Sequence, residues 1–216
     1  MNLLQTNIFQ SLSVATGESL ELIDVFDVPG KKTITLSSHS SLTYLIVGSM
    51  LDVDITIVTT GPYGSCKIFG LFVSDTEHPV RGSLKVALDH SHTSANVELF
   101  SFLYDDAKVA IDGSIAIGMH LDQVHGRLLE QNLVLGKNIS LTTLPKLDVA
   151  SYNVTAAHGA TIDTLDQQKL FYMMSRGLTQ QQSQKLLVNG YIDYVLACFK
   201  EIGDKEKKSV YSKLIK

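Results

Sequence analysis

The sequence is poor in cysteine, the residue that cross-links small or secreted proteins, and in proline. It has two cysteines, Cys66 and Cys198, and four prolines among 216 residues. Two distant thiols make neither a disulfide framework nor a zinc cluster, so we expect two buried apolar side chains. A chain of this length buries most of the surface that its unfolded form exposes, so its core needs no disulfide or metal for stability.

An excess of basic charge and long apolar runs are also missing. The 18 Lys and Arg residues are outnumbered by 22 Asp and Glu residues, which gives a net charge of −4 and argues against a nucleic-acid partner. No run is apolar enough to span a bilayer. The opening "MNLLQTNIFQSLS" lacks the basic flank and apolar stretch of a signal peptide. We therefore expect a cytoplasmic globular protein without a membrane segment.

Alternating apolar and polar residues dominate the region from about residue 20 to residue 155. In "LDVDITIV" (51–58) four apolar residues share one face, and "KVAIDGSIAIG" (108–118) repeats the pattern. Such runs, broken by Gly, Asp, Ser and Asn, predict short strands. A sandwich, a barrel and a parallel β-helix all fit this pattern. Because Asp112-Gly113 is the one clear tight-turn signal, we favour the β-helix, although no fixed sequence period is visible.

The period changes to a helical one after residue 160. Two capping-box patterns, Thr164 with Gln167 and Thr179 with Gln182, predict two helix starts near residues 164 and 179. Gly177 suits the left-handed residue that ends a helix. We predict a β-helix core over residues 1–160 and a C-terminal α-helical hairpin over 161–216, with helices near 164–176 and 179–202 and a frayed charged tail.

Each predicted helix has an apolar face. In the first helix this face contains Leu170, Phe171 and Met174. In the second, residues spaced by three or four predict one buried stripe: Leu187, Tyr191, Tyr194, Cys198 and Ile202. Gly190 lies within that stripe and suggests close approach to a neighbour.

Few patterns in the sequence indicate a chemical site. "GPYGSCK" and "GKN" do not satisfy the P-loop pattern, so we expect no nucleotide bound in that way. His90 and His92 would share one face of a regular strand, where a solvated polar face explains them better than half a metal site. His158 is flanked by small residues, "TAAHGAT". It is either a metal ligand, since imidazole suits iron, zinc and copper, or a hydrogen-bonding residue at the end of a coil.

Three segments resemble the SufB/SufD family, the scaffold proteins of the SUF iron–sulfur cluster assembly system. They are "VALDHSHTSANVELFSFLYDDAKVAIDGSIAIG", "GRLLEQNLVLGKNISLTTLPKLDV" and "HGATIDTLDQQKLFYMMSRGLTQQQSQKLLVNGY". The last segment is the most specific and is closer to SufD, because SufB usually carries a glutamate after the histidine. The sequence resembles a short form without the N-terminal helical domain of the family.

The resemblance implies a right-handed parallel β-helix followed by a C-terminal helical segment. It implies that His158 lies near a junction with a SufB-like scaffold or a second copy of the chain, where an iron–sulfur cluster forms transiently. It also implies that Phe171, Tyr172, Arg176 and Gly177 dock on a SufC-like ABC ATPase, although Phe171 could instead pack beneath the hairpin.

Two departures from the family bear on cluster binding. Ala156 stands where SufD often has a cysteine, and "LLEQNLVLGKN" lacks the cysteine of SufB. One imidazole supplies about a quarter of the four ligands that usually hold a cluster, so we expect that this chain cannot hold one alone.

We therefore expect a non-enzymatic, SufD-like scaffold subunit of an ATPase-driven iron–sulfur cluster assembly complex. Two alternatives remain open. One is a β-helix carbohydrate-active enzyme, and the other is an interaction module of SufBD origin without cluster chemistry.

Overall fold

The computed structural model describes residues 2–5, 11–26, 29–48, 51–164 and 167–215. Fourteen strands precede three helices in these residues. The strands are β1 (Asn2–Gln5), β2 (Ser11–Val14), β3 (Ser19–Phe26), β4 (Gly30–Leu36), β5 (Ser41–Gly48), β6 (Leu51–Thr59), β7 (Ser65–Ser74), β8 (Val80–Leu88), β9 (Ser94–Leu103), β10 (Lys108–Ile117), β11 (Asp122–Val134), β12 (Ser140–Thr143), β13 (Lys146–Val149) and β14 (Asn153–Thr164). The helices are α1 (Gln167–Ser175), α2 (Gln180–Leu196) and α3 (Asp204–Leu214).

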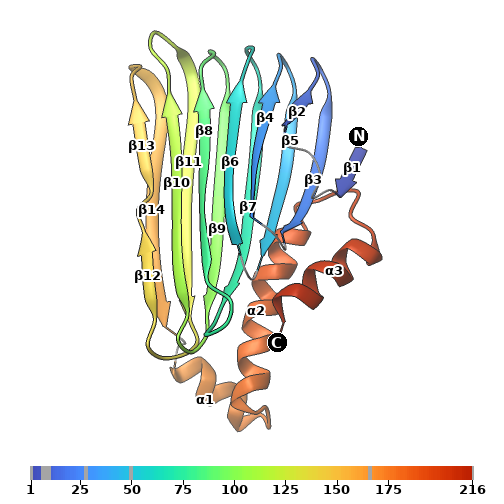
Figure 1. Ribbon diagram of the computed structural model, residues 1–216, viewed down its shortest axis with the longest axis vertical. Helices are drawn as coiled ribbons and strands as arrows, with labels where there is room; N and C mark the ends of the chain where they lie inside the picture. Colours follow the sequence, from blue (N-terminus) through green and yellow to red (C-terminus); the bar gives the residue numbers. More distant parts are fainter. Residues whose placement is uncertain (1, 6–10, 27–28, 49–50, 165–166, 216) are drawn as a thin grey trace.

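The strands form two parallel sheets that face each other (Figure 1). Sheet A has the order β1-β3-β5-β7-β9-β11-β14. Sheet B has the order β2-β4-β6-β8-β10, with both β12 and β13 pairing with β10. Because successive strands alternate between the sheets, each sheet A strand and the following sheet B strand make one coil of a solenoid. The predicted parallel β-helix is confirmed.

The coils lengthen along the chain, which explains why no fixed sequence period is visible. Ser19 lies beside Ser41 in the register of sheet A, 22 residues later. Further along, Ser94 lies beside His125 in the same sheet, and the Asp122 amide donates to the hydroxyl of Ser91, which is 31 residues earlier in the chain. The strands stay paired in parallel as the coils lengthen, with one register shift between β11 and β14 at Asp122 and Val124. The fold therefore keeps its coils although the sequence loses its period.

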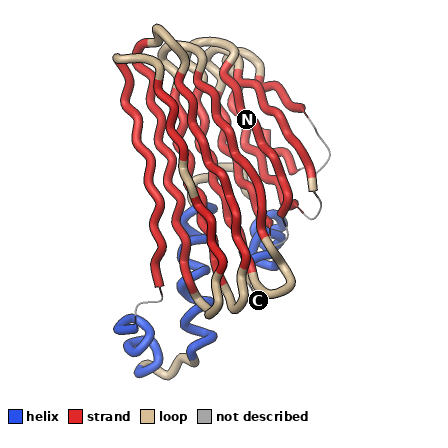
Figure 2. The backbone as a smooth tube through the Cα atoms, turned by 60° about the vertical axis from the view of Figure 1, so that its left-hand side comes forward, coloured by secondary structure: helices blue, strands red, loops and turns tan. Residues whose placement is uncertain are grey.

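Two apolar layers stabilise the molecule. The first fills the space between the sheets with inward-facing residues such as Leu36, Ile57 and Leu88. The second lies between the outer face of sheet A and helices α2 and α3, where Leu71 and Phe102 pack with Ile192. Strands β5, β7 and β9 are therefore buried on both faces over part of their length, which accounts for their continuous apolar runs. Figure 2 shows the helices gathered toward one end of the sheets.

The predicted helical hairpin is present, with shorter helices than expected. Thr179 caps α2 as predicted: its hydroxyl accepts from the Gln182 amide at 3.2 Å, and its own amide donates to the Gln182 side chain at 2.8 Å. Gly177 has the predicted left-handed conformation, with φ of 92°. The other predicted cap, Thr164, is the last residue of β14, and 165–166 lie outside the described residues.

Three details of the helical prediction are wrong. The tail is not frayed, because it contains α3, whose Val210 and Leu214 are fully buried. The buried stripe of α2 is shifted by about one residue from the predicted one and consists of Ser183, Val188, Ile192, Val195 and Leu196. Finally, a Cβ atom on Gly190 would meet nothing within 4 Å, so this glycine marks no close approach within the chain.

Candidate functional site

The solenoid ends in an open coil. Of the strands that the structure describes, β14 pairs only with β11, and both β12 and β13 pair only with β10. Both sheets therefore present free backbone donors and acceptors at the same end, on the left in Figure 1. An unpaired strand edge is a ready template for pairing with another chain. The 12 residues of β14 make this edge long enough for a specific interface.

His158 lies on this terminal strand and faces the interior of the solenoid. It is in register with Leu128, a buried core residue of β11, and Val154 and Ala156 of the same strand also pack against that core. The side chain is nevertheless exposed, because no further coil covers it. The expectation that His158 stands where the β-helix ends therefore agrees with its position, whereas its role as a metal ligand stays a prediction.

The hydrogen bond of His158 determines which ring nitrogen is free. Nδ1 lies 2.9 Å from the carbonyl oxygen of Pro145, which separates β12 from β13. A carbonyl oxygen only accepts, so Nδ1 carries the proton and Nε2 carries the lone pair of the neutral ring. Metal-binding histidines are commonly oriented in this way, with one nitrogen bonded to a backbone carbonyl. The contact is also the coil-end hydrogen bond of the alternative interpretation, so it agrees with both.

Glu130 is a residue that the sequence analysis did not identify. It faces inward from β11 and is only 3% exposed. Its Oε1 accepts from the Gly113 amide at 3.1 Å, and its Oε2 accepts from the Thr143 hydroxyl. Burial raises the pKa of this carboxyl group, while the two hydrogen bonds and, to a lesser degree, nearby His158 act to lower it. The sequence does contain a sign of this residue: in "LLEQNLV" a charged side chain occupies a position where the alternating pattern calls for an apolar one.

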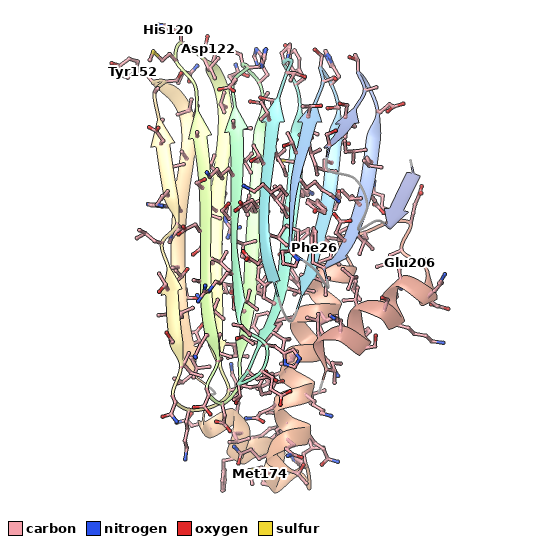
Figure 3. The ribbon with its side chains drawn as sticks, viewed as in Figure 1. Phe26, His120, Asp122, Tyr152, Met174 and Glu206 are labelled. Atoms are coloured by element: carbon pink, nitrogen blue, oxygen red, sulfur yellow. The ribbon has the colours of Figure 1, made fainter. Side chains whose placement is uncertain are left out.

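The residues predicted to dock on a partner lie around the joint between α1 and α2. Phe171 is 75% exposed and Tyr172 is 59% exposed, so Phe171 does not pack beneath the hairpin. The Arg176 guanidinium lies 5.3 Å from the centre of the Tyr172 ring, and Gly177 makes the turn beside them. Of the predicted apolar face of α1, only Leu170 is buried. Figure 3 places Met174 at the opposite end of the molecule from His120 and Tyr152.

The structure does not bring the two predicted regions together into one site. His158 lies in the middle of β14, and the docking residues follow that strand in α1 and the turn after it.

The other two histidines of interest lie in a turn and not on a strand face. His90 and His92 stand between β8 and β9, so the expected strand geometry is wrong. The His90 Nδ1 atom lies 3.1 Å from the Thr59 carbonyl oxygen, and the His92 ring stacks on Tyr63 at a centroid distance of 4.6 Å. The two imidazoles thus have separate partners.

Within the described ranges, no group of three or more His, Cys, Asp or Glu side chains is arranged to hold a metal ion. Cys66 is buried and Cys198 is partly buried, and burial raises the pKa of the Cys66 thiol to about 12.

No helix among the described residues has the length and apolar character needed to cross a membrane.

Comparison with known proteins finds relatives whose similarity covers both the open end of the solenoid and the α1–α2 joint. The family described as "SUF system FeS cluster assembly, SufBD core domain" matches residues 31–191, a range that includes both. The iron–sulfur cluster assembly protein SufD of Escherichia coli is 24% identical over 178 residues, which are 80% of this chain and 40% of that protein. A SufBD family protein of Synechocystis is 30% identical over 128 residues, 59% of this chain and 27% of the relative.

The chain thus spans less than half the length of these relatives, and the match covers most of the solenoid, β14 with His158, and α1 with much of α2. Because the family match extends over well more than half of the sequence, the chain belongs to the SufBD core family of the SUF system, and its relatives include SufD.

Proposed function

We propose that this chain is a SufD-like, non-enzymatic scaffold subunit of an ATPase-driven complex that assembles iron–sulfur clusters. The observation that carries the proposal is His158: it faces inward at the open end of the solenoid with Nδ1 bonded to Pro145 and Nε2 free. Family membership supports this role, since the matched family is described by iron–sulfur cluster assembly.

Two partners complete the proposed complex. The unpaired edge of β14 suits a SufB-like scaffold or a second copy of this chain, because a strand added there would continue sheet A. The exposed aromatic side chains and arginine at the α1–α2 joint suit a SufC-like ABC ATPase, since aromatic residues and arginine are the usual anchors of interfaces. The nascent cluster is the cargo of the junction, and no nucleotide is bound by this chain itself.

Replacement of His158 by alanine tests the proposal. We expect His158→Ala to abolish cluster formation in a complex reconstituted with the ATPase and the second scaffold. Loss of one exposed hydrogen bond costs only about 1 kcal/mol, so thermal stability and complex formation should change little. Cluster formation is followed by visible absorption and stability by circular dichroism.

The possible outcomes separate the alternatives. Cluster assembly at the wild-type rate in His158→Ala would leave His158 a structural residue and contradict the scaffold role. A complex that forms but binds no iron would indicate an interaction module. Failure to retain an ABC ATPase at all would favour the carbohydrate-active class, which has no need of one.

A further inference from the structure

Glu130 and His158 lie on neighbouring strands and face the same way. In the register between β11 and β14, Leu128 is opposite His158 and Glu130 is opposite Ala160. Both side chains therefore point into the solenoid, displaced from each other by one strand and two residues. This makes them diagonal neighbours in the last two strands of sheet A.

Both side chains reach across the interior to the same segment of sheet B. Glu130 accepts the hydroxyl of Thr143, the last residue of β12, and His158 contacts the carbonyl of Pro145, just before β13. The interruption between these two short strands thus fixes the carboxylate and the imidazole from one side. Their positions are defined by sheet B and do not depend on a partner.

Within the described residues, no lysine or arginine forms an ion pair with Glu130. Other carboxylates do form ion pairs, among them Asp24, Asp54 and Glu98. A carboxylate buried among apolar side chains is costly unless it is hydrogen-bonded and paired with positive charge. Glu130 has the hydrogen bonds, and the basic group whose charge acts on it is His158.

We propose that Glu130 and His158 form a two-donor site for a divalent first-row metal ion, iron(II) in the proposed function, on the inner side of the open end. The imidazole would donate through Nε2 and Glu130 through a carboxylate oxygen. Imidazole and carboxylate are the donors that non-haem iron(II) takes from proteins, and further ligands would come from the partner across the junction. The inference rests on the proposed function and deepens it, because it gives this chain a second ligand.

Cobalt(II) titration of the full chain tests the inference without any assembly activity. Cobalt(II) has visible bands that report on its ligands, and we expect Glu130→Gln and His158→Ala each to weaken its binding at least tenfold. Glutamine keeps the size of the side chain and can still accept from Gly113, so the melting temperature of Glu130→Gln should not fall. The matched control is Glu98→Gln, a carboxylate that is 6% exposed on the outer face of the same sheet, and it should bind cobalt(II) as the wild type does.

The outcomes distinguish this inference from the proposed function. If His158→Ala loses cobalt(II) but Glu130→Gln does not, the two-donor site is refuted while the scaffold role stands. If neither variant changes the affinity, or if the wild type takes up no cobalt(II), the inference is overturned. The scaffold role is then judged separately by cluster formation in the reconstituted complex.

Discussion

At the scale of single residues, the open end of the solenoid is defined by polar side chains at positions where the alternation places apolar ones. Glu130 and Asn132 both face inward from β11, and both are nearly fully buried. The Asn132 amide donates to the Thr161 carbonyl at 3.1 Å, and Glu130 bonds to Gly113 and Thr143. The bonds to Gly113 and Thr161 join β11 to the strands β10 and β14, and the bond to Thr143 joins the two sheets of one coil, so polar contacts supplement apolar packing at this end.

Because the pKa of Glu130 is raised, the stability of the fold should depend on pH through this residue. A carboxyl group whose pKa is higher in the folded state binds its proton more tightly there, so its contribution to stability is present at low pH and is lost as pH rises through the folded-state pKa. We therefore expect Glu130→Gln to be more stable than the wild type at pH 7, with a difference that shrinks as the pH falls toward the ordinary glutamate range. Thermal melts from pH 4 to pH 7 measure this. A difference that stays constant across that range would show that the Glu130 charge is not what limits stability.

At the scale of elements, the α1–α2 joint combines a well-capped turn with exposed aromatic side chains. The capping box of Thr179 and the left-handed Gly177 fix the turn, and a Cβ atom at Gly177 would be strained at its φ of 92°. Phe171 and Tyr172 are exposed on the helix that leads into this turn. Because the backbone of the turn is already ordered, less order has to be gained on binding, which suits a docking surface.

A substitution of Arg176 tests whether this surface binds a partner. We expect Arg176→Glu to weaken binding of the proposed ABC ATPase partner by more than about 2 kcal/mol, because the change removes the cation that stacks on Tyr172 and puts a negative charge in its place. The exposed position of Arg176 leaves the fold intact. Co-purification and calorimetry measure the loss, with Arg81→Glu on the outer face of sheet B as the control. Equal retention of the ATPase by both variants would argue against docking at this joint.

At the scale of the whole molecule, the helices and the solenoid share a core. Val188, Ile192 and Val195 of α2 pack on the outer face of sheet A. The buried Glu21 carboxylate of β3 accepts from the backbone amides of Lys200 and Glu201, at 2.9 and 3.0 Å. The segment after residue 160 is thus fastened to the first coils, although the nearest strand in sequence is β14.

Because the core is shared, damage to α2 should destabilise the solenoid as well. Ile192 is fully buried, and we expect Ile192→Ala to lower the free energy of unfolding by about 2–5 kcal/mol. The loss should appear equally in urea titrations followed by circular dichroism at helix and strand wavelengths. Leu186→Ala, on the exposed side of the same helix, should stay within about 0.5 kcal/mol of the wild type. Separate transitions for helices and strands in Ile192→Ala would contradict a shared core.

The sequence by itself determined the periodicities and the local signals of this protein. Alternation in segments such as "LDVDITIV", the capping box at Thr179 and the turn at Gly177 depend on neighbours within a few residues, and the structure contains all three. The placement of His158 near the end of the β-helix was also expected from the sequence, because the alternating pattern ends close to it.

Only the tertiary structure decided which residues meet across long separations. The one-residue shift of the α2 stripe depends on how that helix lies on sheet A, and α3 is held by apolar contacts that its charged sequence hides. Glu130 was missed because its partners, Gly113 and Thr143, belong to the opposite sheet. The local sequence pattern determines whether a side chain faces the interior or the outside of the solenoid. The residues that it contacts there depend on coil length and strand register, and both vary along this chain.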